Sequence, residues 1–227
     1  MSHSRAVRFD TFGDPSVLAV TELTPPEPQA GEITVDVRHA GVNFAEVMFR
    51  RGQFPMDLPH FPGLEAVGTV RSADADVTGF TVGEDVAALP LDGDGNADVV
   101  AAPAEHTVPL TGRLDGIDRA AAAGAPCNVT TALGVLTSAD HLAAGETVVV
   151  LAAAGGVGTA AAELARVPGA STVIGSTSST RKAQYALPFG TTASSPTSSW
   201  PTRSPSATRA GAPTSSWTRS AARTAPR

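Results

Sequence analysis

The residues best placed for chemistry form a glycine-rich turn, AAAGGVG at 152–158, which lies between an apolar run and a helix-forming run. The apolar run at 148–151 predicts a buried strand. Such a turn lets a backbone approach a diphosphate, whose charge is stabilised at the helix N-terminus. We expect Gly155 and Gly156 to permit the turn, and Gly158 to permit close packing of helix and strand. A tight Ala/Gly turn without a ligand is the alternative.

A second apolar strand is predicted at 171–176, and the residues that follow it indicate which nucleotide is bound. An NAD site usually carries Asp or Glu about 20 residues beyond the glycine turn, for the ribose hydroxyls. The segment 175–182 has hydroxyl groups and two cations but no carboxylate, which suits a 2′-phosphate and favours NADP(H). A helix N-cap followed by a solvated basic pair is the alternative. The predicted cofactor-binding residues of the two segments are Ala154, Gly155, Gly156, Val157, Gly158, Ser176, Thr177, Ser178, Arg181 and Lys182.

The elements that position these residues suggest two kinds of structure. Up to residue 110, short strands predicted at 33–37, 66–71, 81–89 and 106–110 alternate with Gly, Pro and Asp turns, which is typical of a mostly antiparallel β domain. Near Asp118 the chain becomes Ala-rich and helical, and then gives strand, glycine turn, helix and strand. That order opens a parallel α/β unit. The predicted fold class is therefore α/β with a β-rich N-terminal domain.

Composition excludes several function classes. The chain has 227 residues, 42% of them hydrophobic, and a formal net charge of −6, which argues against a nucleic-acid surface. A single cysteine, Cys127, excludes an intramolecular disulfide and suggests a reducing compartment. No run approaches the ~18 apolar residues of a membrane helix, and no secretory signal pattern begins the sequence. The expected location is the cytoplasm.

Further motifs make the chain resemble the medium-chain dehydrogenase/reductase superfamily, in its zinc-free quinone oxidoreductase (zeta-crystallin-like) branch. They are AGVNFAEVMFRRGQFP at 40–55, LPHFPGLEAVGTV at 58–70, FTVGEDVAAL at 80–89, PCNVTTAL at 126–133, AAAGGVG at 152–158 and VIGSTSSTRK at 173–182. The resemblance implies a GroES-like substrate domain at 1–118 and a partial Rossmann NADP(H)-binding domain at 119–190. It also implies an active site in the cleft between these domains.

The resemblance assigns two further residues. Asn43 is implied as the catalytic polar group near substrate or nicotinamide, and also as a cofactor contact, while Thr131 is implied as a cofactor contact. A turn asparagine and a helix hydroxyl bonded to its own backbone are the alternatives. Zinc-dependent relatives carry a Cys near Asn43-Phe44-Ala45-Glu46 and a His between the Gly and Glu of the later motif. This chain has Gly63-Leu64-Glu65 there, so no metal site is predicted.

The chemistry implied is hydride transfer from NADPH to a quinone or another conjugated carbonyl (enone). Phe54 stands where relatives often place Tyr, and the one tyrosine is Tyr185, so the substrate domain offers no tyrosine proton donor. This favours quinone reduction over stereospecific enoyl reduction. A cofactor-binding or crystallin-like protein without turnover and a non-functional gene product are the alternatives. Relatives are often homodimers, through a region that we do not find in this chain.

The C-terminal segment 191–227 is predicted to be disordered. After Gly190 the chain contains no Val, Ile, Leu, Met, Asn or Gln, and it repeats TSSW. Such a segment buries too little apolar surface to offset its ordering entropy. It is either a genuine Ser/Arg tail, such as a phosphorylated or RNA-contacting one, or the product of a frameshift.

The frameshift hypothesis rests on the resemblance. Reading the gene one base earlier from the Gly190 codon allows GYDRVVPDLVLADAV and, later, PDLVLDPVGG, which resemble strands expected further along a Rossmann domain. Both copies of TSSW then become apolar strands. We therefore expect the 227-residue chain to be a truncated reductase with impaired turnover.

Overall fold

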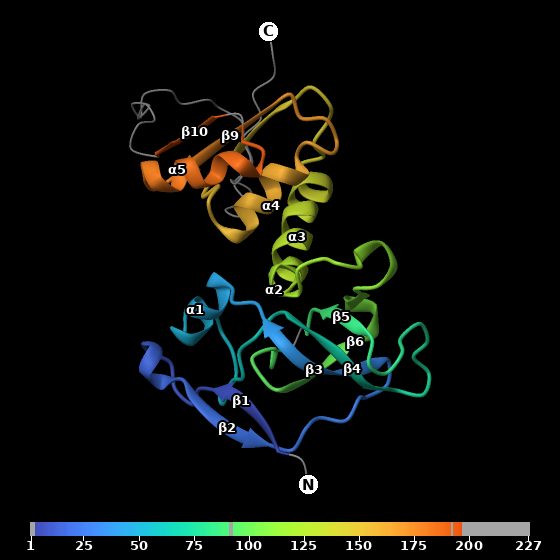
Figure 1. Cartoon of the computed structure of the whole chain (residues 1–227). Coiled ribbons are helices and arrows are strands. Elements are labelled where there is room, and N and C mark those ends of the chain that lie inside the picture. Colours follow the sequence, from blue (N-terminus) through green and yellow to red (C-terminus); the bar gives the residue numbers. More distant parts are fainter. Residues whose placement is uncertain (1–2, 91–92, 192, 197–227) are drawn as a thin grey trace. The chain divides into compact units, whose positions relative to one another are not determined.

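The computed structural model describes residues 3–90, 93–191 and 193–196, the last of these by their backbone alone. The chain divides into two compact units, Met1–Cys127 and Asn128–Arg227. Each unit is coloured by its place in the sequence in Figure 1. The division lies later than the predicted boundary at 118/119. The reason is that Ala122 and Ala123 are buried in a cluster of the first unit, with Val67, Ala87 and Leu110.

The first unit is built from two antiparallel sheets (Figure 1). A hairpin of β1 (Ser4–Arg8) and β2 (Ala19–Leu23) forms the smaller sheet. The larger sheet has the order β6-β3-β4-β5-β7. Its strands are β3 (Glu32–Ala40), β4 (Ala66–Ala73), β5 (Asp85–Ala88), β6 (Val99–Pro103) and β7 (Thr107–Pro109). The predicted antiparallel β domain is confirmed.

One strand boundary differs from the sequence prediction, and one polar side chain is buried within a strand. β5 begins at Asp85 rather than near 81, because Gly83 adopts a φ of +89° and the N–H of Thr81 is held by the Glu84 carboxylate in a turn. Thr34, a polar residue of β3, is 0% exposed. Its hydroxyl lies 2.6 Å from the Ser72 hydroxyl, so the polar side chain is hydrogen-bonded where it is buried.

Short helices complete the first unit. They are α1 (Phe44–Arg50), α2 (Arg119–Ala122) and the 3-10 turns η1 (Pro15–Val17), η2 (Ala104–His106) and η3 (Gly112–Leu114). Asn43 is the N-cap of α1 and comes shortly after the end of β3 at Ala40, so a predicted site residue lies just beyond this strand.

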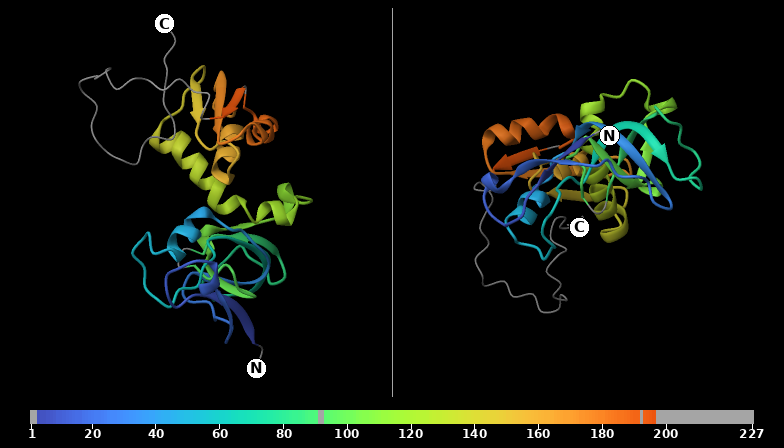
Figure 2. Two further views of the ribbon diagram at one scale, coloured as in Figure 1. Left: turned by 90° about the vertical axis from the view of Figure 1, so that its left-hand side faces the viewer. Right: turned by 90° about the horizontal axis from the view of Figure 1, so that it is seen from below.

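The second unit is a three-stranded parallel sheet with helical connections (Figure 2). The strands have the order β10-β9-β8. The elements are β8 (Thr147–Val150), α4 (Gly156–Leu164), β9 (Thr172–Thr177), α5 (Thr180–Ala186), η5 (Leu187–Phe189) and β10 (Ala193–Pro196). α3 (Ala125–Gly134) and a π-helical turn, η4 (Val135–Ala139), precede them. The predicted strand, turn, helix and strand are confirmed.

β10 is a correction to the predicted disorder of 191–227. Residues 193–196 pair in parallel with β9, in a register that sets Ala193 against Ile174. A ladder of backbone hydrogen bonds does not require the apolar side chains on which the prediction depended. The remainder of the predicted tail, 197–227 with both TSSW repeats, lies outside the described residues.

Small side chains dominate the core of the second unit. Ala153, Ala162, Ala165, Ala170 and Ala186 are buried together with Leu136, Val148, Val150 and Val173. Alanine at so many buried positions lets helix and sheet backbones approach closely. The core of the first unit is instead mostly β-branched, as expected of strands.

The core of the first unit supplies a direct stability test. Ile33 on β3 is 0% exposed, so Ile33→Ala is expected to lower the free energy of unfolding by ~2–5 kcal/mol through lost burial and the cavity left behind. Ile117, which is 41% exposed, is the matched control, and Ile117→Ala should change stability by about 0.5 kcal/mol or less. Urea unfolding measures both, and equal effects would contradict the assigned core.

Candidate functional site

The glycine turn of the second unit begins where β8 ends. Its left-handed residue is Ala152, with a φ of +53°, and Ala152 accepts a 2.8 Å hydrogen bond from the N–H of Gly155. Gly155 has a φ of −92°, a conformation open to any residue. The left-handed conformation of the turn therefore falls on Ala152 and not on Gly155, although a Cβ on Gly155 would lie only 3.2 Å from the carbonyl oxygen of Ala152.

Gly158 lies against backbone, and Gly156 lies against a side chain. A Cβ on Gly158 would lie 2.3 Å from the carbonyl oxygen of Ala152, so α4 can begin this close to the turn only with glycine there. A Cβ on Gly156 would lie 2.7 Å from Oδ1 of Asn128, a residue of α3. Ala154 is half-buried and Val157 is exposed. The predicted role of Gly158 in close packing agrees with this geometry.

The end of β9 lies next to the glycine turn. The N–H of Ala153 donates a 2.9 Å hydrogen bond to the carbonyl oxygen of Ser176. The two predicted cofactor-binding segments, 154–158 and 176–182, therefore meet at the carboxyl ends of β8 and β9. Ligands of open α/β sheets bind at this edge.

The predicted residues at the end of β9 and just after it divide into a buried and an exposed set. Ser176 and Thr177 are 3% and 2% exposed, and the Thr177 hydroxyl donates to the carbonyl oxygen of Ser179. Ser178, Arg181 and Lys182 are exposed. The buried pair supports the turn before α5, so the side chains that can reach a ligand are those of the exposed set.

Thr131 is exposed on α3, one turn after Asn128, whose carboxamide packs against Gly156. Residues three apart share one face of a helix. Asn128 was not among the residues predicted from the sequence. It contacts the glycine turn and lies on the same face of α3 as Thr131. Because a hydroxyl and a carboxamide three residues apart resemble many helix surfaces, the sequence carried no signal for it.

In the first unit, Asn43 is a buried N-cap with apolar neighbours. Its side chain donates from Nδ2 to Oε1 of Glu65 over 2.8 Å, and Asn43 itself is 7% exposed. Val42 and Phe44, on either side of it, are 78% and 72% exposed. A hydrogen-bonded carboxamide between two exposed apolar side chains suits a flat, partly polar ligand.

Two buried glutamates hold the Asn43 segment. Glu46 accepts the N–H of Asn43 at 3.0 Å and the N–H of Leu64 at 2.9 Å. Burial raises the pKa of the Glu46 carboxyl group, three backbone N–H groups oppose the rise, and the nearby Glu65 carboxylate adds to it. Sequence reasoning missed both roles, although Asn43-x-x-Glu46 has the spacing of a capping box.

The residues that replace zinc ligands do not form a metal-binding group. Within the described ranges, no three or more His, Cys, Asp or Glu side chains could hold a metal ion together. His39 is exposed, and His60 packs against Phe9 with 5.2 Å between ring centroids. Burial lowers the pKa of His60, as expected for a packing residue that is neutral at pH 7. Phe54, at the tyrosine position, packs edge-on against Phe49.

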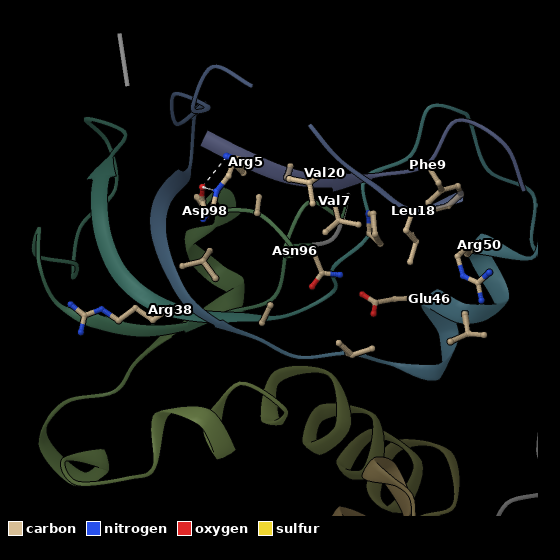
Figure 3. Close-up of a pocket in the computed structure, with 17 residues that line it drawn as sticks. Arg5, Val7, Phe9, Leu18, Val20, Arg38, Glu46, Arg50, Asn96 and Asp98 are labelled. Carbon is tan, nitrogen blue, oxygen red and sulfur yellow. Dashed lines mark hydrogen bonds and ion pairs between the residues drawn. The ribbon is translucent and has the colours of Figure 1, made fainter. Parts of the chain in front are cut away.

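A cavity of about 620 Å³ lies between the β1–β2 hairpin, β3 and α1. Figure 3 shows the Glu46 carboxylate pointing into it from α1, with the Asn96 carboxamide opposite. Arg50, 6% exposed, also lines the cavity and donates to the carbonyl oxygen of Gly13. Asn43 does not line the cavity, but Val42 and Glu46 on either side of it do.

Comparison with known proteins decides the family. Residues 29–177 match the family described as "Alcohol dehydrogenase GroES-like domain". The quinone oxidoreductase of Pseudomonas aeruginosa is 35% identical over 190 residues. This chain belongs to the medium-chain dehydrogenase/reductase superfamily, in its quinone oxidoreductase-like branch. The branch is one of oxidoreductase enzymes, and the predicted GroES-like domain followed by a Rossmann-type unit is confirmed.

Other relatives of the branch have the same fold. The mouse "Synaptic vesicle membrane protein VAT-1 homolog-like" is 34% identical over 176 residues. The structure of its human counterpart matches with a TM-score of 0.78 at 33% identity, covering 85% of this chain and 61% of that chain. The Escherichia coli quinone oxidoreductase, solved in complex with NADPH, matches with a TM-score of 0.74 at 29% identity, covering 84% and 57%.

The shared region is only part of these relatives. It covers 82% of this chain but 57% of the Pseudomonas protein, and 77% of this chain but 41% of the mouse protein. The chain thus spans about half the length of the curated relatives that it matches. In the part of the chain that the structure describes, no helix combines the length and apolarity needed to cross a membrane.

The close approach at Gly158 can be tested by substitution. Gly158→Ala should destabilise the second unit by ~1–3 kcal/mol, because its Cβ meets the Ala152 carbonyl oxygen at 2.3 Å. Gly134 is the matched control, since it is helical and a Cβ there meets nothing within 4 Å. Gly134→Ala should stabilise by up to about 1 kcal/mol. Thermal unfolding measures the stability of both variants. A Gly158→Ala protein as stable as wild type would contradict the close contact at Gly158.

The raised pKa of Glu46 gives a pH test. A carboxyl group with a raised folded-state pKa contributes stability that is fully present below its ordinary value of 4.5 and is lost as the pH rises through the folded-state pKa. The stability of wild type relative to Glu46→Gln should therefore fall with rising pH across that window. Urea unfolding from about pH 4 to about pH 8 measures the difference. The variant Glu27→Gln is the control, because Glu27 is exposed, and its free energy of unfolding should change with pH as that of wild type does. The same pH dependence for Glu46→Gln and wild type would refute the raised pKa of Glu46.

Proposed function

We propose that this protein is an NADPH-dependent, zinc-independent oxidoreductase that transfers hydride to a quinone or another conjugated carbonyl compound. The observation that carries the proposal is the glycine turn, where Gly158 permits a backbone approach that any Cβ would block. The end of β9 lies beside it through the Ala153–Ser176 hydrogen bond, and Arg181 and Lys182 follow in the first turn of α5. Family membership supports the reaction class.

The preference for NADPH rests on the exposed residues after β9. Arg181 and Lys182 are exposed, and residues 172–182 contain no carboxylate that would repel a 2′-phosphate. Cations and hydroxyl groups bind phosphate through charge-assisted hydrogen bonds. Ser178 and the N–H groups at the start of α4 complete the residues that would hold the nucleotide, with Thr131 on α3. The NADPH complex of the Escherichia coli relative supports this choice.

The first unit would bind and orient the acceptor. NADPH, when bound, supplies the hydride. Asn43 offers a carboxamide whose orientation is fixed by Glu65, and Val42 and Phe44 offer exposed apolar surface for a planar ring. The one tyrosine, Tyr185, belongs to the second unit, so protonation is assigned to water or another group. The lack of a tyrosine proton donor in the first unit favours quinones as the acceptor.

The alternative is an NADPH-binding or crystallin-like protein without turnover, or a non-functional product. Its support is that, among the described residues, β8 pairs with another strand on one side only. We therefore expect weak turnover from this 227-residue chain. The cytoplasmic location, the homodimer of relatives and the frameshift stay predictions. NADPH oxidation with simple quinones tests catalysis, and NADPH fluorescence titration separates a binder from an unfolded product.

The basic pair can be tested without turnover. Arg181→Ala with Lys182→Ala should weaken NADPH binding about 10- to 100-fold, because two charge-assisted contacts to the 2′-phosphate are lost. NADH binding should change much less. Exposed Arg113→Ala in η3 is the control of equal charge type. Fluorescence titration measures both nucleotides, and an NADPH affinity equal to wild type in the double variant would contradict the NADP(H) assignment.

A further inference from the structure

One carboxylate, that of Glu65, connects the predicted catalytic residue to the start of α3. Glu65 is 0% exposed. Its Oε1 accepts the side-chain N–H of Asn43 at 2.8 Å, and its Oε2 accepts the backbone N–H of Cys127 at 2.8 Å. Cys127 lies in the first turn of α3. Both oxygens are therefore used, by groups far apart in the sequence.

The packing around Glu65 leaves it no room to move. A Cβ on Gly41 would lie 2.3 Å from Oε1 of Glu65 and 2.5 Å from the carbonyl oxygen of Ala123. The N–H of Gly41 also donates to the carbonyl oxygen of Glu65 at 3.1 Å. The segment that leads into Asn43 is thus held directly against the buried carboxylate.

The chemistry of the pair fixes the direction of the Asn43 carboxamide. A carboxylate only accepts hydrogen bonds, so the NH₂ end of Asn43 must face Glu65. Turning the carboxamide over would set Oδ1 against a carboxylate oxygen inside the protein, which is unfavourable in a buried site. Asn43 therefore has one allowed orientation as long as residue 65 is an acceptor.

We propose that Glu65 is a positioning residue, which sets the orientation of the Asn43 carboxamide and couples Asn43 to the first turn of α3. A ligand that displaces Asn43 or holds it more firmly then changes how well ordered the first turn of α3 is. A change in the order of that turn likewise changes how firmly Asn43 is held. The role of Asn43 toward NADPH or acceptor rests on the proposed function. The coupling between Asn43, Glu65 and α3 does not.

A swapped pair tests the orientation. With Asn43 oriented as in wild type, Glu65→Gln sets an NH₂ group against a donor at either Asn43 or Cys127, so the Asn43 carboxamide must turn over to pair with it, while Asn43→Asp sets two carboxylates 2.8 Å apart. The double variant Asn43→Asp/Glu65→Gln restores donor to acceptor, with the direction reversed, and Asp is also a good N-cap. Each single variant should lower Tm, and the double variant should recover most of the loss. A double variant no better than Glu65→Gln would overturn the proposal.

Cys127 reports on the start of α3, because it is the one cysteine of the chain. Alkylation by iodoacetamide should be at least about 10-fold faster in Glu65→Gln than in wild type, and should return toward the wild-type rate in the double variant. Glu84→Gln is the matched control, since Glu84 also accepts one backbone N–H and one side-chain hydrogen bond. It should leave the alkylation rate unchanged. A wild-type rate in Glu65→Gln would also overturn the proposal.

The effect of NADPH on Cys127 alkylation distinguishes a positioning role of Glu65 from a purely stabilising one. In wild type, saturating NADPH should slow Cys127 alkylation severalfold, and in Glu65→Gln it should give no protection even at saturation. If wild type binds no NADPH by fluorescence, the proposed function fails, while the swapped-pair cycle still decides the role of Glu65. If NADPH binds and protects Glu65→Gln as well as wild type, the coupling is refuted.

Discussion

The first unit depends on carboxylates that are buried with no cationic partner among the described residues. Glu65 and Glu46 each accept two N–H groups, and together they join the segments around Asn43, Leu64 and Cys127. Removing a carboxylate from water costs several kcal/mol unless hydrogen bonds replace its hydration. These N–H groups must therefore stay where they are, which makes the end of β3, the start of α1 and the start of α3 one rigid arrangement.

The second unit depends on a different constraint, the close approach of backbones. Gly158 brings the start of α4 against the Ala152 carbonyl group, and buried alanines at 153, 162 and 165 continue the same tight packing. The turn before α4 carries backbone strain, because Ala152 takes a φ of +53°. The N–H groups of α4 are thereby presented at the edge of the sheet, where a diphosphate is stabilised by the helix dipole.

Much of the architecture could be predicted because it depends on local patterns. Period-two runs gave the strands of the first unit, and a glycine turn between an apolar run and a helix gave the parallel unit. Other features depend on contacts that no local pattern contains. Ser176 and Thr177 look like ligand-binding hydroxyls in the sequence, but their side chains are buried at the end of β9. β10 formed in a segment without apolar signal, because strand pairing requires only backbone groups.

The sequence by itself determined the family, the order of the two kinds of structure and the residues that suit a dinucleotide, since motifs and spacing are properties of the chain. The tertiary structure alone decided which of those residues are accessible and which are held. It buried Glu65 between Asn43 and Cys127, and it set Asn128 against Gly156. These pairs are distant in the sequence, and a hydrogen bond or a close contact between them exists only when folding brings their elements together.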